Sequence, residues 1–174
     1  MDFLELAKRR YSERRFDPRP VEQEKLDRIL EAGRVVPTAH NNQPQRIYVL
    51  RSPEALETLR SVTAFHYNAP LALLVCYDAD TVWRSEAEQL YPDYHSGEQD
   101  ASICATTMMY EAEELGVHSL WVRGFDAKAV LEAYRLPEAH RPVMILLLGY
   151  PNEQARPSRL HSLRMPLEDM VTQL

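Results

Sequence analysis

The sequence predicts an α+β fold in which helices cover a central sheet. Two nearly continuous apolar runs, Leu71 to Tyr77 and Pro142 to Leu148, are typical of strands that are covered on both faces. Ala101 to Leu115 repeats small and apolar side chains at helical spacing, which makes it the longest predicted helix. Two predicted helices at the N-terminus and a polar tail at the C-terminus do not fit a simple βαβ winding, so α+β is favoured over α/β.

Length and composition limit the class of protein. The chain has 174 residues, enough for a sizeable core, and is most simply one domain spanning residues 1–174. Asp2 and Glu5 stand inside an amphipathic pattern unlike a secretory signal, and the longest apolar run is too short to cross a bilayer. We therefore expect a cytoplasmic protein with no membrane partner. The formal net charge of -6 speaks against nucleic-acid binding.

The first half of the chain is divided by capping and breaker signals. Asp2 to Arg10 is predicted as a short helix, and Val21 to Val35 as a second helix that follows two prolines. Arg46 to Leu50 carries the β-branched residues of a strand. Ser52-Pro53 starts a helix that ends near Arg60, because serine caps a helix and proline suits its first position.

The second half follows the same logic. The polar segment Asp78 to Gln99 is predicted as loop and broken helix. Gly116 is placed at the C-cap of the long helix, and His118 to Val122 is predicted as a strand. Asp126 caps a helix that runs to about Tyr134.

Four arginines crowd residues 9–16, where the first helix runs out into an extended segment. Arg10, Ser12 and Arg14 alternate there, so their side chains share one face and can reach one ligand. Guanidinium and hydroxyl groups suit a phosphate and the polar edge of a ring. The alternative is that these arginines only complement the helix dipole and lie in solvent.

Several catalytic signatures are absent from the sequence. It contains neither a GxGxxG after a strand, nor a GxxxxGK[ST] loop, nor a GxSxG elbow, so the dinucleotide-fold, phosphate-loop and esterase interpretations lack the motifs they need. The six histidines and two cysteines lack metal-ligand spacing, so no metal site is expected. Glu111, Glu113 and Glu114 are interpreted as a solvated helix face without an acid-base role.

Several polar motifs have no structural explanation, and they follow one another in a fixed order. They are Arg10-Tyr11-Ser12-Glu13-Arg14, Pro37-Thr38-Ala39-His40-Asn41-Asn42-Gln43-Pro44, Tyr67-Asn68-Ala69-Pro70, Trp121-Val122-Arg123-Gly124-Phe125, Leu148-Gly149-Tyr150-Pro151, and Arg156-Pro157-Ser158 with His161-Ser162-Leu163-Arg164-Met165-Pro166. In this order, and over nearly the whole chain, they resemble the FMN-dependent nitroreductase family, and in particular its compact members with a short insertion.

The resemblance implies a nitroreductase-like sandwich with a central, mainly antiparallel sheet flanked by helices, assembled as an intertwined homodimer with two shared FMN clefts. By this resemblance Arg10 and Arg164 would hold the phosphate. Ser12 would contact the ribityl or pyrimidine end, and Arg14 the N1 and C2 carbonyl edge. The remaining implied cofactor-binding residues are Tyr11, Asn68 at the pyrimidine edge, Pro37, Thr38, Ala39 and Asn41 from the other subunit, and Trp121, Val122, Arg123 and Gly124 beside the ring.

The implied activity is that of an NAD(P)H-dependent nitroreductase-type oxidoreductase. It would pass a hydride from NADH or NADPH through FMN to a nitroaromatic, quinone or similar acceptor in a ping-pong cycle. No catalytic side chain is assigned, because the flavin carries the chemistry. The alternative is a protein that binds or delivers FMN with little turnover of its own.

Two positions depart from the family pattern. Met165 stands where many relatives carry a basic residue, which implies fewer charges around the phosphate. Arg123 stands where relatives often carry a small or acidic residue. It either points into the cleft and favours an anionic substrate, or faces solvent so that only its backbone matters.

Overall fold

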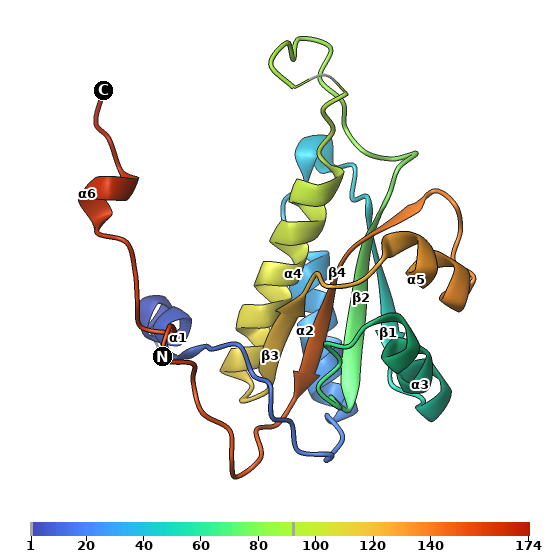
Figure 1. Ribbon diagram of the computed structural model, residues 1–174. Coiled ribbons are helices and arrows are strands. Elements are labelled where there is room, and N and C mark those ends of the chain that lie inside the picture. Colours follow the sequence, from blue (N-terminus) through green and yellow to red (C-terminus); the bar gives the residue numbers. More distant parts are fainter. Residues whose placement is uncertain (1, 92) are drawn as a thin grey trace.

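The strands form one four-stranded sheet in the computed structural model, which describes residues 2–91 and 93–174 (Figure 1). They are β1 (Gln45–Leu50), β2 (Leu71–Asp78), β3 (His118–Val122) and β4 (His140–Gly149). Their order is β1-β2-β4-β3, and each neighbouring pair is antiparallel. The predicted α+β class with a mainly antiparallel sheet is therefore confirmed.

Helices cover both faces of the sheet (Figure 1). One buried cluster joins it to α2 (Gln23–Arg34) and α4 (Gly97–Glu114), and a second joins it to α3 (Pro53–Val62) and α5 (Ala127–Tyr134). The other helical segments are α1 (Phe3–Arg9), the 3-10 turn η1 (Ala39–Asn41) and α6 (Leu167–Met170).

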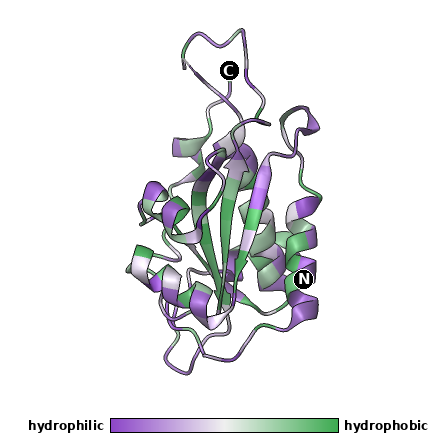
Figure 2. Cartoon of the chain, turned by 90° about the vertical axis from the view of Figure 1, so that its right-hand side faces the viewer, coloured by the Kyte–Doolittle hydropathy of each residue, from purple (hydrophilic) through white to green (hydrophobic). Residues whose placement is uncertain are grey.

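The apolar run of β2 is divided between these two clusters. Leu71, Leu73 and Val75 face the α2 and α4 side, while Ala72 and Leu74 face the α3 and α5 side. Successive strand side chains point to opposite faces, so a strand covered on both faces needs an unbroken apolar sequence. Figure 2 shows this hydrophobic character along the middle of the sheet.

α2 and α4 pack closely because a glycine stands at their contact. A Cβ atom on Gly33 would lie 2.8 Å from the side chain of Met108, so a larger residue would force the helices apart. The Cys104 thiol donates to the Gly33 carbonyl oxygen over 3.3 Å. Burial raises the pKa of Cys104 to about 11, as expected of a thiol that serves in packing.

Three of the predicted helix starts are confirmed by their caps. The Asp2 side chain accepts from the Leu4 amide, Ser52 accepts from Ala55, and Asp126 accepts from Ala129. At the end of α4, Gly116 takes φ 72 directly after the cap residue Leu115. Only glycine adopts that left-handed conformation without a steric penalty, and it turns the chain into β3.

Two predictions need correction. α4 starts at Gly97, earlier than the predicted Ala101, because the Ser96 carbonyl already accepts from the Asp100 amide at 2.8 Å. Glu113 is not on a solvated face: its side chain is 4% exposed, and its Oε1 lies 2.8 Å from Nε of Arg9. α1 covers this end of α4, which the periodicity of α4 alone could not reveal.

The C-terminal tail leaves the sheet after β4, passes α1 and carries α6 away from the body of the molecule (Figure 1). Its apolar side chains are largely exposed, among them Leu160, Leu163, Met165, Leu167 and Met170. None of the described helices combines the length and apolar character needed to cross a lipid bilayer.

Candidate functional site

The arginine-rich segment 10–16 runs beside β3 in an extended conformation, as predicted. Ser12 forms a parallel bridge with Ser119, and the Glu13 amide donates to the Ser119 carbonyl oxygen at 3.0 Å. Side chains alternate from Ser12 to Arg14, so the Glu13 side chain is buried while Arg14 on the other face is exposed. The alternation ends there, because Arg15 is also exposed and Phe16 is buried.

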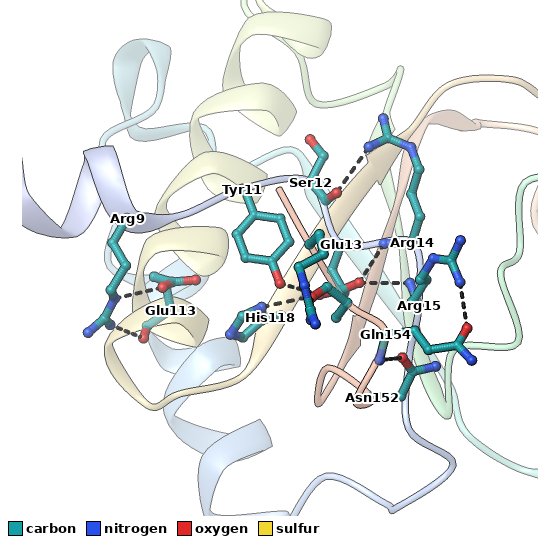
Figure 3. A network of polar contacts seen from close by, with 12 residues as sticks. Arg9, Tyr11, Ser12, Glu13, Arg14, Arg15, Glu113, His118, Asn152 and Gln154 are labelled. Atoms are coloured by element: carbon teal, nitrogen blue, oxygen red, sulfur yellow. Dashed lines mark hydrogen bonds and ion pairs between the residues drawn. The ribbon is translucent and has the colours of Figure 1, made fainter. Parts of the chain in front are cut away.

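The buried side chain of Glu13 fixes the backbone of segment 10–16 through hydrogen bonds (Figure 3). The side chain of this residue, which is 1% exposed, accepts hydrogen bonds from the amides of Arg14 at 2.9 Å and Arg15 at 2.7 Å. Its other carboxylate oxygen accepts from the Tyr11 hydroxyl at 2.7 Å. Burial first, and then the hydrogen bond to Glu13, raise the pKa of Tyr11, so the phenol stays a donor.

A polar cavity of about 280 Å³ lies over this segment, and we call it the arginine pocket. It is lined by Arg10, Tyr11, Ser12, Arg14, Ser158, Leu160, His161 and Arg164. Two predicted phosphate ligands from opposite ends of the chain, Arg10 and Arg164, therefore meet in one cavity. Three guanidinium groups and hydroxyl donors, without a carboxylate in the lining, suit an anion such as phosphate.

A second cavity of about 310 Å³, the strand pocket, follows the end of β3. It is lined by Arg14, Phe65, Tyr67, Leu120, Trp121, Val122, Arg123 and Gly124. Aromatic side chains and the edge of a strand suit a flat ring with polar edges. Arg14 lines both pockets, so the two cavities adjoin.

The wall of the strand pocket is fixed by contacts between its two segments. The Thr63 hydroxyl donates to the Gly124 carbonyl oxygen at 2.7 Å and accepts from the Phe65 amide at 3.1 Å. A Cβ on Gly124 would lie 2.4 Å from the Phe65 ring, so only glycine allows this approach.

Arg123 lines the strand pocket but is tied to its own turn. Its guanidinium lies 4.8 Å from the centroid of the Phe125 ring, and it donates to the Phe125 carbonyl oxygen at 3.3 Å. The residue is exposed, so its charge is also open to solvent. Whether this charge faces a bound flavin or only solvent stays a prediction.

Five predicted site residues do not line either pocket: Pro37, Thr38, Ala39, Asn41 and Asn68. The Ala39 amide donates at 3.0 Å to Asp100, in the first turn of α4, whereas Arg9 pairs with Glu113 at the far end of the same helix. At 1.5 Å per residue, about 20 Å of helix separates those two contacts. Within one chain, the 37–43 loop therefore stands far from the arginine pocket.

The 37–43 loop nevertheless has an uncommon backbone conformation, and contacts hold it in place. His40, Asn41 and Gln43 have φ of 52, 56 and 50, and the His40 ring stacks on Trp83 at 5.3 Å. Asp100, which is 3% exposed, accepts from the Ser96 hydroxyl at 2.6 Å as well as from Ala39. Left-handed conformations are uncommon outside glycine and are kept where the surroundings hold them, often at functional sites.

Sequence reasoning missed several lining residues. Phe65 and Leu120 have no polar signal, so only the folded chain places them in the strand pocket. His161 lacks the spacing of a metal ligand in the sequence, and no cluster of possible metal ligands exists among the described residues. The available signal in the sequence was the position of His161 between Arg156 and Arg164.

Comparisons with known proteins agree with this geometry. The model of the nitroreductase family matches residues 7–65 and 63–150. A nitroreductase family protein of Clostridium difficile is 40% identical, with a TM-score of 0.89 over 99% of this chain and 98% of its own. A Methanothermobacter thermautotrophicus protein, provisionally named NADH dehydrogenase/NAD(P)H nitroreductase, is 32% identical over 92% of this chain and 86% of its own.

A further solved structure, from Exiguobacterium sibiricum, shares the fold at 22% identity. Its TM-score is 0.82 over 100% of this chain and 98% of its own, and it was determined in complex with FMN.

Proposed function

The chain belongs to the nitroreductase family, and from this we propose that it is an FMN-dependent oxidoreductase that uses NADH or NADPH to reduce a small organic acceptor. The observation that carries this proposal is the pair of adjoining pockets joined by Arg14. One pocket suits a phosphate and the other a flat ring, which are the two ends of FMN.

We assign the phosphate to Arg10 and Arg164 and the middle of the cofactor to Ser12. Arg14 stands at the junction of the pockets, which suits a contact with the N1 and C2 carbonyl edge of the ring. Val122 and Gly124 would border the ring through their backbone, and Tyr11 would support Ser12 through Glu13. When bound, FMN would supply two-electron transfer between a reduced nicotinamide and an acceptor such as a nitroaromatic or a quinone.

The protein's own residues would bind and orient. Trp121, which is 45% exposed, lines the strand pocket, where an aromatic side chain can support a flat substrate. Arg123 adds a positive charge to the same lining, which favours anionic substrates. No side chain needs to exchange a proton for the electron transfer, so we assign no acid-base catalyst.

We further propose that two chains build each site. Pro37, Thr38, Ala39 and Asn41 lie far from the pockets of their own chain, and a second copy could bring them there. The exposed apolar tail with α6, together with Phe3 and Leu4 of α1, offers the surface that such an assembly would bury. Asn68 is exposed beside Tyr67, at the border of the strand pocket, and would reach the pyrimidine edge.

An anaerobic assay of the FMN-loaded protein tests the activity. We expect NADH or NADPH to bleach the flavin absorbance within seconds, and a quinone or nitroaromatic to restore it. Tight FMN binding without bleaching by either nicotinamide would instead support a protein that carries or delivers FMN.

Sedimentation of the FMN-loaded protein tests the shared site. We expect a dimer that FMN stabilises by mass action, with a melting temperature that rises with FMN concentration. A monomer saturated with FMN would overturn the shared-site model while leaving the chemistry open to the previous assay.

A further inference from the structure

The arginine pocket contains a titratable residue to which nothing above assigns a role, His161. His161 lies in a turn of the C-terminal tail. In this turn the His161 amide donates to the Ser158 carbonyl oxygen at 2.8 Å. Its ring Nε2 lies 2.9 Å from the carbonyl oxygen of Lys8, in the last turn of α1. A carbonyl oxygen can only accept, so Nε2 carries the hydrogen.

The remaining polar atom of the ring is Nδ1, which makes no hydrogen bond to any described residue. In a neutral ring with hydrogen on Nε2, Nδ1 is an acceptor and would oppose the lone pairs of a phosphate oxygen. In a doubly protonated ring Nδ1 donates, and the bond to phosphate is charge-assisted. His161 can therefore bind an anion through Nδ1 only when its ring is doubly protonated and positively charged.

The charged and titratable groups around His161 come from three segments. The end of α1 contributes Lys8 and Arg10, and the tail contributes Arg164, whose guanidinium donates to the His161 carbonyl oxygen. The extended segment contributes Arg14, which lines the same pocket, and Tyr11, whose ring centroid lies 6.2 Å away. Glu13 bonds to the Tyr11 hydroxyl and is not part of the pocket lining.

Resting on the FMN assignment above, we propose that His161 is a third cationic ligand of the FMN phosphate and takes up a proton from solvent when the phosphate binds. A histidine changes charge between about pH 5 and 8, so the contribution depends on pH within that range.

Calorimetry of the FMN-free full-length protein at pH 7.5 tests this directly. FMN is titrated in two buffers with different ionisation enthalpies, and riboflavin, which lacks the phosphate, is titrated in parallel. The phosphate itself is nearly fully ionised at this pH, since its second pKa is about 6. We expect FMN to bind with uptake of roughly half a proton or more, and riboflavin with none.

Three variants separate the ring's charge from its structural contact. His161→Gln keeps an N–H for the Lys8 carbonyl but is always neutral, so proton uptake should disappear. Its FMN affinity should fall roughly tenfold at pH 6.5 and less than about threefold at pH 8.5, with riboflavin affinity unchanged. His161→Lys should restore FMN affinity at both pH values without proton uptake. His140→Gln, which replaces a histidine at the start of β4 outside the pocket, is the control and should behave as wild type.

Equal proton uptake in wild type and His161→Gln would overturn the proposal, as would an equal loss of FMN and riboflavin affinity that lysine does not repair. His161 would then only fasten the tail to α1. Failure of the wild-type protein to bind FMN or riboflavin at all is a different result, and it would overturn the proposed function together with this inference.

Discussion

The buried carboxylate of Glu13 lies 2.7 Å from the hydroxyl of Tyr11, and both side chains support a segment whose outward face carries Ser12 and Arg14 (Figure 3). The same carboxylate accepts the amides of Arg14 and Arg15. A residue that never touches the pockets thus fixes the backbone that lines them.

The first prediction concerns Glu13→Ala. It leaves two amides and the Tyr11 hydroxyl without their acceptor, and each partly buried donor left unpaired costs about 1–3 kcal/mol. With three such donors, we expect the free energy of unfolding to fall by about 3 kcal/mol or more and FMN affinity to fall with it. Urea unfolding and fluorescence titration measure the two effects.

Glu13→Gln and Glu24→Ala are the matched variants. Glutamine keeps one oxygen for the two amides, so Glu13→Gln should be clearly milder than Glu13→Ala. Glu24 is exposed on α2, and its removal should change stability by less than about 0.5 kcal/mol. If Glu13→Ala were as mild as Glu24→Ala, the Glu13 contacts would not hold the segment.

Local signals were sufficient to predict most of the fold. Ser52-Pro53 and Asp126 predicted the starts of two helices. The unbroken apolar sequence of β2 predicted a strand that is covered on both faces, which the helices on either side confirm. These features depend on neighbours in the chain, which a sequence displays directly.

The exceptions depend on contacts between distant segments. Glu113 is buried because α1 folds over the end of α4, and Asp100 is buried because the 37–43 loop returns to the start of that helix. His161 reaches the arginine pocket only through the path of the tail. The alternation of Arg10, Ser12 and Arg14 did predict their shared pocket, because that pattern is local.

The second prediction tests Asp100 as the support of the 37–43 loop. Asp100→Ala removes the acceptor of the Ala39 amide and of the Ser96 hydroxyl, so the loop should loosen. If the loop of one chain completes the site of the other, FMN affinity should fall roughly tenfold or more, although about 20 Å of helix separates Asp100 from Glu113, at the end of α4 that α1 covers. Fluorescence titration with FMN measures this effect.

Asp100→Asn keeps an acceptor for Ala39 and should lose much less affinity. Asp80→Ala, an exposed change in the segment after β2, should leave FMN affinity at the wild-type value. Full FMN affinity in a folded Asp100→Ala protein would mean that the loop takes no part in the site.

The third prediction is a pH dependence of stability that arises from the buried thiols. An ordinary thiol ionises near 9, while burial raises the pKa of Cys76 to about 12 and of Cys104 to about 11. Below pH 9 the thiols stay protonated in both the folded and the unfolded chain, so their contribution to the free energy of unfolding is fully present. Above pH 9 the unfolded chain loses thiol protons that the folded chain retains, which favours unfolding. Each thiol should therefore lower the free energy of unfolding by about 1.4 kcal/mol per pH unit, for Cys104 between about pH 9 and 11.

The comparison of Cys104→Ala with wild type isolates this effect. The variant should be less stable below pH 9, because alanine leaves a cavity beside Gly33, but its stability should decline less steeply from pH 9 to 11. Cys76 and the tyrosines are common to both proteins, so their titration cancels in the difference. Parallel stability curves would show that Cys104 does not resist ionisation in the folded state.

The last prediction concerns Arg14, the only residue that lines both pockets among those described. Its guanidinium donates at 3.0 Å to the Ser12 carbonyl oxygen, which turns it along the segment and toward the junction of the cavities. If it donates to the N1 and C2 carbonyl edge of FMN, it stabilises the negatively charged reduced flavin more than the neutral oxidised ring. Removing it should make the bound flavin harder to reduce.

A hydrogen bond to a charged group contributes about 1.5–3 kcal/mol, and 30 mV corresponds to about 1.4 kcal/mol for a two-electron couple. Arg14→Ala should therefore lower the midpoint potential of bound FMN by about 30–65 mV, with only a modest loss of FMN occupancy because Arg10 and Arg164 remain. Arg15→Ala is the matched control, since Arg15 carries the same charge one residue away, donates to Gln154 and lines neither pocket. Potentiometric titration of both variants decides the matter: equal potentials in Arg14→Ala and Arg15→Ala would place the Arg14 charge away from the flavin ring.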